Sequence, residues 1–349
     1  MPGLPRIVAI GTAVPAHDIH KAFIAFAATR LEGTREEAVF ARMAARSGIA
    51  YRWSVLPVGQ SPVEPGGFYA GHFPGTAARM ALYAEAAPEL ALAAITSLGP
   101  VDDVTHIVVA SCTGFVAPGI DQILAARLNL APTVERTLIG FMGCYAAVTA
   151  LKAARHIVRS EPDARVLVVT VELSTLHLQE TTALAPLLAM LQFGDGAAAA
   201  LVTGDGAGLA LDNPFAATLP ASDDLIRWDI GDTGFAMHLS GEVPARIADA
   251  LADPVTRAAL TGGIDAQAVE GWAVHAGGRS ILDAVAHGLS LAPEALAESR
   301  GVLEAFGNMS SATLMFVLAR LFETRPSRGV ALAFGPGLAA EGLGFGWTP

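Results

Sequence analysis

The chain has 349 residues and a formal net charge of −11, and 52% of its residues are hydrophobic while 16% are charged. This length allows two domains or one large α/β body. The acidic balance argues against a nucleic acid partner, because no stripe of Lys and Arg is available to neutralise phosphates. No apolar run approaches the roughly 20 residues that span a bilayer, so we expect no stable membrane insertion, and two cysteines without a metal-ligand spacing indicate a reducing cytoplasm.

Short apolar runs alternate with helical patterns along the chain, which predicts an α/β fold with buried, largely parallel sheets. Residues 1–16 are interrupted by prolines and glycines, so we expect a first strand there and not a signal peptide. Further strands are predicted at Ile107–Ala110, Val166–Val171, Ala197–Val202, Trp272–His275 and Val330–Phe334. Helices are predicted at Arg79–Leu98, Asp121–Leu128, from Ala146 onward, and at Ser310–Leu321. A glycine-rich stretch at 204–208 divides the chain into halves 1–205 and 206–349.

Cys144 stands where a glycine turn, Gly140-Phe-Met-Gly143, leads into a predicted helix. The first N–H groups of such a helix have no internal partners, and their partial positive charge favours a thiolate. A buried structural cysteine is the alternative explanation. The two are distinguished by whether a base and an oxyanion donor exist elsewhere in the chain.

His275 and Asn308 are the candidates for these two roles. His275 closes a predicted strand and precedes two glycines, which allow a ligand to approach closely, and Asn308 lies in a turn before a predicted helix. Taken singly, they are explained as a core histidine and a helix N-cap. Together with Cys144 they supply a nucleophile, a base and an oxyanion donor. A papain-like cysteine hydrolase has the same chain order of Cys, His and Asn, although its Cys-Gly-Ser-Cys-Trp signature is absent here.

Five segments resemble, in order and spacing, the signature segments of type III polyketide synthases, the chalcone and stilbene synthase-like enzymes. They are Gly140–Ala147, Phe193–Ala198, Trp272–Gly278, Gly307–Ala312 and Phe334–Gly337. Ketoacyl synthases share the Cys-His-Asn set but differ around His and Asn and lack the Phe-Gly-Pro-Gly loop. The resemblance implies a thiolase-like α/β fold, with two duplicated halves in a five-layered αβαβα arrangement, and a homodimer.

The resemblance also implies a mechanism. Cys144 would take an acyl group from a CoA starter, while His275 would pair with the thiolate and, with Asn308, would hold the thioester oxygen of malonyl-CoA. Decarboxylation would give an enolate that extends the chain on Cys144, and repeated cycles would end in cyclisation to a pyrone, resorcinol or phloroglucinol, as in bacterial members. CoA thioesters are then the substrates, and neither a metal nor another cofactor is expected. The alternatives are a single ketoacyl synthase condensation, a hydrolase, and a catalytically silent chain-length subunit.

Further residues are assigned by the same resemblance. Phe193 matches a gatekeeper aromatic, and Met237 stands where a second aromatic is usual, which suggests a more adaptable entrance. The remaining residues expected around the substrate are Cys112, Ser174, His177, Phe334, Gly335 and Pro336, and His177 is expected to narrow the acyl cavity. Ala117 replaces a larger residue that crosses the dimer interface in plant enzymes. Ala333 replaces the first glycine of the family's usual Gly-Phe-Gly-Pro-Gly loop, so a plant-type product is not expected.

CoA needs cations where its phosphates bind. Arg42, Arg46 and Arg52 form a local basic cluster in an acidic chain, and the first two share one helix face at i, i+4 spacing. The cluster aligns with the CoA-binding segment of the family, and a solvated charged face is the alternative. Gly277, Gly278 and Ser280 are expected to contact the pantetheine arm.

Overall fold

A nine-stranded sheet runs through the part of the chain that we describe, residues 4–57 and 61–349, in a computed structural model. Its strands, in spatial order, are β11 (Gly271–Val274), β12 (Gly329–Gly335), β13 (Ala339–Thr348), β8 (Gly208–Thr218), β1 (Arg6–Ala13), β7 (Asp195–Thr203), β6 (Val166–Leu173), β4 (His106–Ser111) and β5 (Glu135–Gly140). All predicted strands are confirmed, although β11 ends one residue before His275.

The expectation of a largely parallel sheet is wrong. Of the eight neighbouring strand pairs, three are parallel and five are antiparallel. One reason is visible at Pro336–Leu338, a short turn that joins β12 to β13. A connection this short can only reverse the chain, whereas parallel neighbours need a long crossover.

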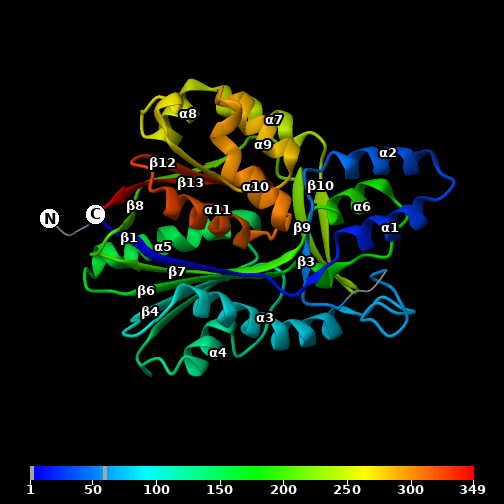
Figure 1. Cartoon of the computed structure of the whole chain (residues 1–349), viewed down its shortest axis with the longest axis horizontal. Coiled ribbons are helices and arrows are strands. Elements are labelled where there is room, and N and C mark those ends of the chain that lie inside the picture. Colours follow the sequence, from blue (N-terminus) through cyan, green and yellow to red (C-terminus); the bar gives the residue numbers. More distant parts are fainter. Residues whose placement is uncertain (1–3, 58–60) are drawn as a thin grey trace.

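The sheet has two halves that are joined by little backbone pairing. β1 and β8 share only the pairs Arg6↔Ala210 and Ile7↔Leu209. Beyond this seam the two halves diverge, and helices fill the space between them (Figure 1). The strands before residue 204 lie on one side of the seam and those after residue 207 on the other.

Helices and half-sheets alternate in five layers (Figure 1), as expected. α3 (Thr76–Leu98) and α4 (Ile120–Arg127) cover the first half-sheet from outside, and α5 (Ala146–Ser160) and α11 (Ser311–Thr324) lie between the half-sheets. The outer layer of the second half is formed by α7 (Val243–Ala252), α8 (Pro254–Thr261), α9 (Arg279–Gly288) and α10 (Ala297–Phe306). The predicted helices correspond to α3, α4, α5 and α11.

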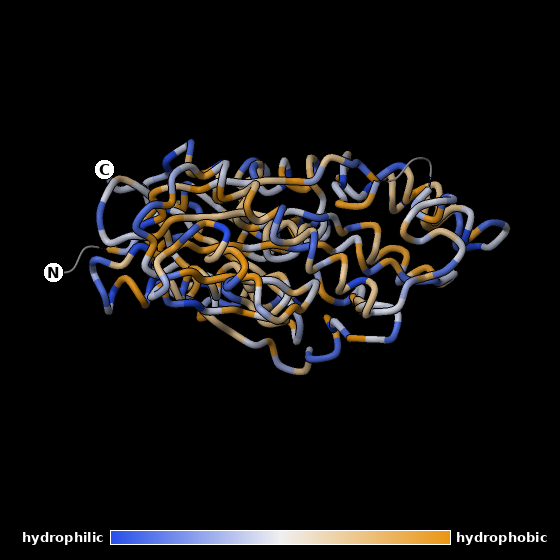
Figure 2. The backbone as a smooth tube through the Cα atoms, turned by 90° about the horizontal axis from the view of Figure 1, so that it is seen from below, coloured by the Kyte–Doolittle hydropathy of each residue, from blue (hydrophilic) through white to orange (hydrophobic). Residues whose placement is uncertain are grey.

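Burial explains why α5 and α11 occupy the middle. The α5 side chains Ala147, Ala150 and Ala154 are fully buried, and α11 is buried from Ser311 to Leu318. A helix that is apolar around most of its surface must be covered on more than one side. In Figure 2 hydrophobic colour accordingly runs through the interior of the layered body, and hydrophilic colour gathers on its outer loops.

A smaller lobe lies at one end of the layers (Figure 1). It contains α1 (His20–Leu31), α2 (Arg35–Ala45), α6 (Leu184–Met190), the short pair β2 (His17–Asp18) and β3 (Trp53–Ser54), and the hairpin of β9 (Ile226–Gly231) and β10 (Gly234–Leu239). Phe23, Phe26, Phe40 and Leu187 form a separate apolar core beneath its helices. The hairpin covers the end of the layers at which Cys144 lies.

Candidate active site

Cys144 lies in a tight elbow between β5 and α5. It is the middle residue of the 3-10 turn Gly143–Tyr145, which leads directly into α5, so the predicted turn-to-helix position is confirmed. Phe141 and Gly143 have φ values of 57° and 73°, in the left-handed region. A Cβ on Gly143 would lie 2.3 Å from Cδ of Pro336, so only glycine allows this approach.

The structure brings His275 and Asn308 to the same cavity as Cys144. His275 follows β11, its backbone N–H donates to Leu332 O at 2.8 Å, and neither ring nitrogen has a hydrogen-bond partner among the described residues. The Asn308 amide is held at both ends, with Nδ2 donating to Gly277 O at 3.2 Å and Oδ1 accepting from Ser310 N at 2.8 Å. These three residues line what we call the nucleophile cavity, which has a volume of about 50 Å³.

Burial dominates the electrostatics of the nucleophile. It raises the pKa of Cys144 to about 12, and the Glu172 carboxylate contributes in the same direction. Contacts with Ser310, whose Oγ lies 3.8 Å from Sγ, and with Asn308 act in the opposite direction. Burial also lowers the pKa of His275 to about 3. Burial therefore disfavours the charged form of both side chains, and a thiolate forms when the thiol proton passes to an acceptor.

Glu172 sits beneath the nucleophile at the end of β6. Its carboxylate accepts hydrogen bonds from Cys112 N at 3.0 Å, from Thr113 Oγ1 at 2.8 Å and from the Ser311 hydroxyl. Burial raises the pKa of Glu172 to about 7. Sequence reasoning gave this residue no role, although a carboxylate within a largely apolar strand run was an available signal.

The second thiol supports the elbow as well as lining the cavity. Cys112 is 1% exposed, and its Sγ accepts a hydrogen bond from Gly143 N at 2.9 Å. Burial, together with the charge of Glu172, raises the pKa of Cys112 well above its ordinary value. Cys112 therefore stays a thiol near neutral pH.

Most of the residues predicted around the substrate lie on the nucleophile cavity. Seven of them line it: Cys112, Ser174, Phe193, Met237, Phe334, Gly335 and Pro336. His177 does not. It lines a second space of about 310 Å³, which we call the rear cavity. Its ring donates through Nε2 to Thr113 O at 2.7 Å, accepts at Nδ1 from Phe235 N at 3.0 Å, and stacks on Phe235 at 4.2 Å.

Trp228 is a cavity residue that sequence reasoning missed. It lines both the nucleophile cavity and the rear cavity, and its Nε1 donates to Cys112 O at 2.9 Å. It lies on β9, where residues 226–231 are mostly exposed. Ile226, Trp228 and Ile230 alternate with Arg227 and Asp229, and this period of two, which places Trp228 on the face of the buried Ile226, was an available signal.

The residues expected to bind CoA lie in three different places. A space of about 730 Å³, which we call the mouth cavity, is lined by Arg46, Gly277, Gly278 and Ser280. It shares four lining residues with the nucleophile cavity: Leu239, Val243, Gly277 and Ile281. Arg42 is exposed on α2 and is not among the residues that line the mouth cavity.

The expectation of one basic cluster is wrong for Arg52. This residue is 1% exposed, and its guanidinium donates to Met190 O at 2.9 Å and to Phe193 O at 2.6 Å. The physical reason is that the chain turns inward before it, where Ala50 N bonds Glu304 O at 2.8 Å at the end of α10. Arg52 therefore fixes the backbone of the Phe193 segment.

Comparison with known proteins identifies the family. The family models for chalcone and stilbene synthases match residues 2–206 (N-terminal domain) and 211–345 (C-terminal domain). The chain belongs to the chalcone and stilbene synthase family. Proteins of this family are the type III polyketide synthases, acyltransferases that form carbon–carbon bonds from CoA thioesters.

Similar sequences and structures agree with this family. The alpha-pyrone synthesis polyketide synthase-like protein Pks18 of Mycobacterium tuberculosis is 33% identical over 68% of this chain and 64% of its own length, so the match spans less than two thirds of that relative. Bisdemethoxycurcumin synthase of Oryza sativa is 32% identical over 98% of this chain and 92% of its own length. The crystal structure of 1,3,6,8-tetrahydroxynaphthalene synthase from Streptomyces coelicolor superposes with a TM-score of 0.89, at 29% identity and 99% coverage of both chains. This solved structure supports the thiolase-like fold.

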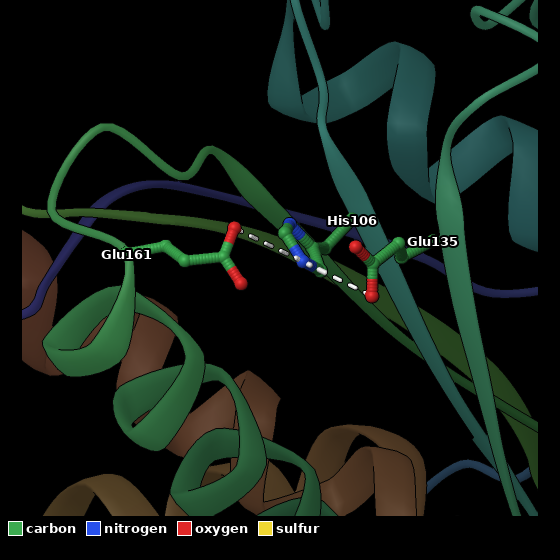
Figure 3. Close-up of side chains that lie close together, drawn as sticks. All are labelled: His106, Glu135 and Glu161. Atoms are coloured by element: carbon green, nitrogen blue, oxygen red, sulfur yellow. Dashed lines mark ion pairs between the residues drawn. The ribbon is translucent and has the colours of Figure 1, made fainter.

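One group of potential metal ligands in this chain lies far from the thiol. His106 Nε2 is 3.7 Å from Glu135 Oε2 and 3.9 Å from Glu161 Oε2 (Figure 3). His106 begins β4, and the nucleophile cavity begins just past the other end of this six-residue strand, about 20 Å away at the usual rise per residue. This group therefore takes no part in chemistry at Cys144. None of the helices in the described ranges could span a bilayer.

Proposed function

We propose that this chain extends an acyl-CoA starter by repeated decarboxylative condensation with malonyl-CoA, and then cyclises the product to a pyrone, resorcinol or phloroglucinol. The observation that carries the proposal is the nucleophile cavity, where Cys144, the unpaired ring of His275 and the fixed amide of Asn308 meet. A thiol, a base and a preorganised hydrogen-bond donor are the groups that thioester condensation needs.

Loading comes first in this scheme. His275 accepts the Cys144 proton, and the sulfur attacks the carbonyl carbon of the starter thioester. The new C–S bond to Cys144 forms as the bond to CoA breaks, and CoA leaves as a thiol with that proton. Both His275 nitrogens are free to take this role because the described residues offer them no hydrogen bond.

Extension uses the same residues as donors. The thioester oxygen of malonyl-CoA accepts hydrogen bonds from His275 and from Asn308 Nδ2, and loss of CO2 leaves an enolate that these donors stabilise. The enolate carbon attacks the Cys144 thioester, a carbon–carbon bond forms, and the C–S bond to Cys144 breaks. The lengthened β-keto chain, now on CoA, returns to Cys144. The scheme consumes CoA thioesters alone and requires neither a metal nor another cofactor.

Two further assignments belong to this proposal. CoA would lie in the mouth cavity with its phosphates near Arg46, and Gly277, Gly278 and Ser280 would flank the pantetheine arm. The enzyme would act as a homodimer, with the halves 1–205 and 206–349 as its domains and the cytoplasm as its location. The exposed edge strand β5, where Leu138 is 46% exposed, is a surface that a second copy would cover.

The test is incubation of the purified chain with malonyl-CoA and a panel of acyl-CoA starters, with products read by mass spectrometry. We expect products that contain two or more malonyl-derived units and form without a carrier protein. A single extension that appears only with an acyl carrier protein would indicate a ketoacyl synthase instead. Cleavage of an amide substrate without carbon–carbon bond formation would indicate a hydrolase.

A further inference from the structure

The three cavities of this chain lie in series. The mouth cavity meets the nucleophile cavity at Leu239, Val243, Gly277 and Ile281. The nucleophile cavity meets the rear cavity at four other residues. These four, which we call the passage, are Ser174, Phe193, Trp228 and Met237. An acyl group attached to Cys144 therefore has the mouth cavity, where CoA is proposed to bind, on one side and the rear cavity on the other.

The nucleophile cavity is too small to hold an acyl chain. Its volume of about 50 Å³ has room for one or two groups of water or methylene size, taken at roughly 30 Å³ each. The rear cavity, at about 310 Å³, has room for about ten such groups on the same basis. A starter longer than two or three carbons must therefore pass into the rear cavity.

The shape of the passage favours a thin chain over a ring. The Phe193 and Trp228 rings lie 6.5 Å apart between centroids with a 33° tilt, a separation at which aromatic rings are in contact. No aromatic starter fits between them. The other two sides of the passage are a small hydroxymethyl and a flexible thioether, which leave space for a row of methylenes.

The walls of the rear cavity present mostly carbon. Phe23, Tyr69, Leu178, Met190 and Phe235 supply much of its surface. Several of its polar groups already bond one another or the backbone. These are the Ser54 and Thr175 hydroxyls at 2.7 Å, the Tyr69 hydroxyl on Thr175 O at 2.9 Å, both nitrogens of His177, and Gln179 Nε2. An alkyl chain makes no hydrogen bonds with water, so it loses none when it enters this cavity. An oxygenated chain loses its hydration there.

We propose that the rear cavity binds the starter, and that the starter is a straight aliphatic acyl group of about eight to twelve carbons. This inference rests on the proposed function and names its substrate class. Two buried atoms in these walls have no partner in the described structure, Ser174 Oγ in the passage and Arg52 Nη2, so a terminal carboxylate on the starter is the competing chemistry to be tested.

The first experiment measures kcat/KM for acetyl-, hexanoyl-, decanoyl-, lauroyl- and palmitoyl-CoA, and for benzoyl- and adipyl-CoA, with malonyl-CoA saturating. We expect kcat/KM to rise two- to fourfold for each added methylene and to stop rising between ten and twelve carbons, where the cavity is full. Decanoyl-CoA should exceed both acetyl-CoA and benzoyl-CoA at least a hundredfold. Adipyl-CoA has the chain length of hexanoyl-CoA with a terminal carboxylate, and we expect it to be at least tenfold poorer.

The second experiment fills the rear cavity. Met190→Trp adds an indole to its wall and should lower the decanoyl-to-butyryl ratio of kcat/KM at least twentyfold. The matched control is Thr182→Trp, an exposed position near α6 that lines none of the three cavities, and it should leave this ratio within twofold. Thermal melting of both variants separates loss of fold from a change in preference.

The outcomes distinguish this inference from the proposed function. If short or aromatic starters are extended well and decanoyl-CoA is not preferred, or if adipyl-CoA exceeds hexanoyl-CoA, the inference is overturned and the proposed function stands. A Met190→Trp ratio equal to that of Thr182→Trp also overturns it. If no starter is extended at all, the proposed function itself fails.

Discussion

Two turns deliver the reactive groups of this protein, and they hold those groups in different ways. The turn before α5 carries Cys144 and contains two residues with positive φ, Phe141 and Gly143. The turn before α11 carries Asn308 and also contains two, Gly307 and Ser310. Both lead into helices of the middle layer, so both positions are fixed by the most deeply buried part of the fold.

The difference lies in the side chains. The Asn308 amide is bonded at both ends, by Ser310 N and by Gly277 O, at 2.8 and 3.2 Å. The Cys144 thiol has only weaker contacts, with Ser310 Oγ at 3.8 Å from Sγ and with Asn308. A donor that stabilises developing charge acts best when it is already in place, because no reorganisation is then needed. A nucleophile must move onto its target and away again. The comparison indicates that this site fixes its donor and leaves its nucleophile free.

The largest expected effect comes from removing the Cys144 thiol, which should abolish acyl transfer but not decarboxylation. Cys144→Ala should lower transfer of a radiolabelled acyl group to the protein, and chain extension, by at least about 10⁴-fold, because the attacking atom is gone. Release of CO2 from malonyl-CoA should stay within about tenfold of the unsubstituted rate, since His275 and Asn308 remain. Equal loss of both activities would show that the turns do not have separate roles.

The reciprocal change acts on the other turn. Asn308→Asp keeps the oxygen that accepts the Ser310 N–H and loses the Nδ2 donor. We expect malonyl-CoA decarboxylation to fall about 10²- to 10³-fold, the usual loss for one oxyanion donor. Acyl loading onto Cys144, followed by intact-protein mass in the absence of malonyl-CoA, should change less than tenfold. A larger loss in loading than in decarboxylation would reverse the assignment.

A methyl group added at the glycines of these turns should lower the stability of the fold. A Cβ on Gly143 would meet Pro336 Cδ at 2.3 Å, and one on Gly307 would meet Arg52 Cγ at 2.8 Å and Gln192 O at 2.9 Å. Gly143→Ala and Gly307→Ala should each destabilise the fold by about 2–3 kcal/mol, visible as a lower Tm. Gly33→Ala is the control, because Gly33 also has positive φ but has no atom within 4 Å of the added carbon, and it should cost about 1 kcal/mol. Equal Tm values for all three would show that neither turn is tightly packed.

The smallest effect concerns the carboxylate beneath the nucleophile. The folded-state pKa of Glu172 is raised from 4.5 to about 7, so the folded chain holds a proton that the unfolded chain has lost in this interval. Its contribution to stability therefore falls as pH rises from about 4.5 to 7, by roughly 2 kcal/mol. Glu172→Gln should reduce the fall in urea midpoint between pH 5 and pH 8.

Asp195 contributes to the same dependence of the urea midpoint on pH, so Glu172→Gln alone removes only part of it. Burial raises its pKa from 3.8 to about 6, so it contributes in the same direction and remains in the Glu172→Gln variant. The double variant with Asp195→Asn should flatten the slope further. An unchanged slope in both variants would contradict the raised pKa values.

Sequence reasoning predicted most of the central strands and helices, and the three residues that meet in the nucleophile cavity, because both leave local patterns. Buried strands are runs of apolar residues, and Cys144, His275 and Asn308 lie in short segments whose spacing is specific. It failed for strand direction and for Arg52, because these depend on how distant segments meet. Arg52 looks like a surface cation in sequence, and only the bond between Ala50 and Glu304 shows that the chain turns inward there. The cavity volumes were out of reach for the same reason, whereas Trp228 was missed although it alternates with charged residues along its strand.

The measurement that tests the central claim most directly is the mass of the Cys144 peptide after the protein is mixed with an acyl-CoA and no malonyl-CoA. The account predicts an added acyl mass on the peptide that contains Cys144, its disappearance when malonyl-CoA is supplied, and its absence in Cys144→Ala. An acyl group found on Cys112, or extended product formed without any adduct on Cys144, would contradict it.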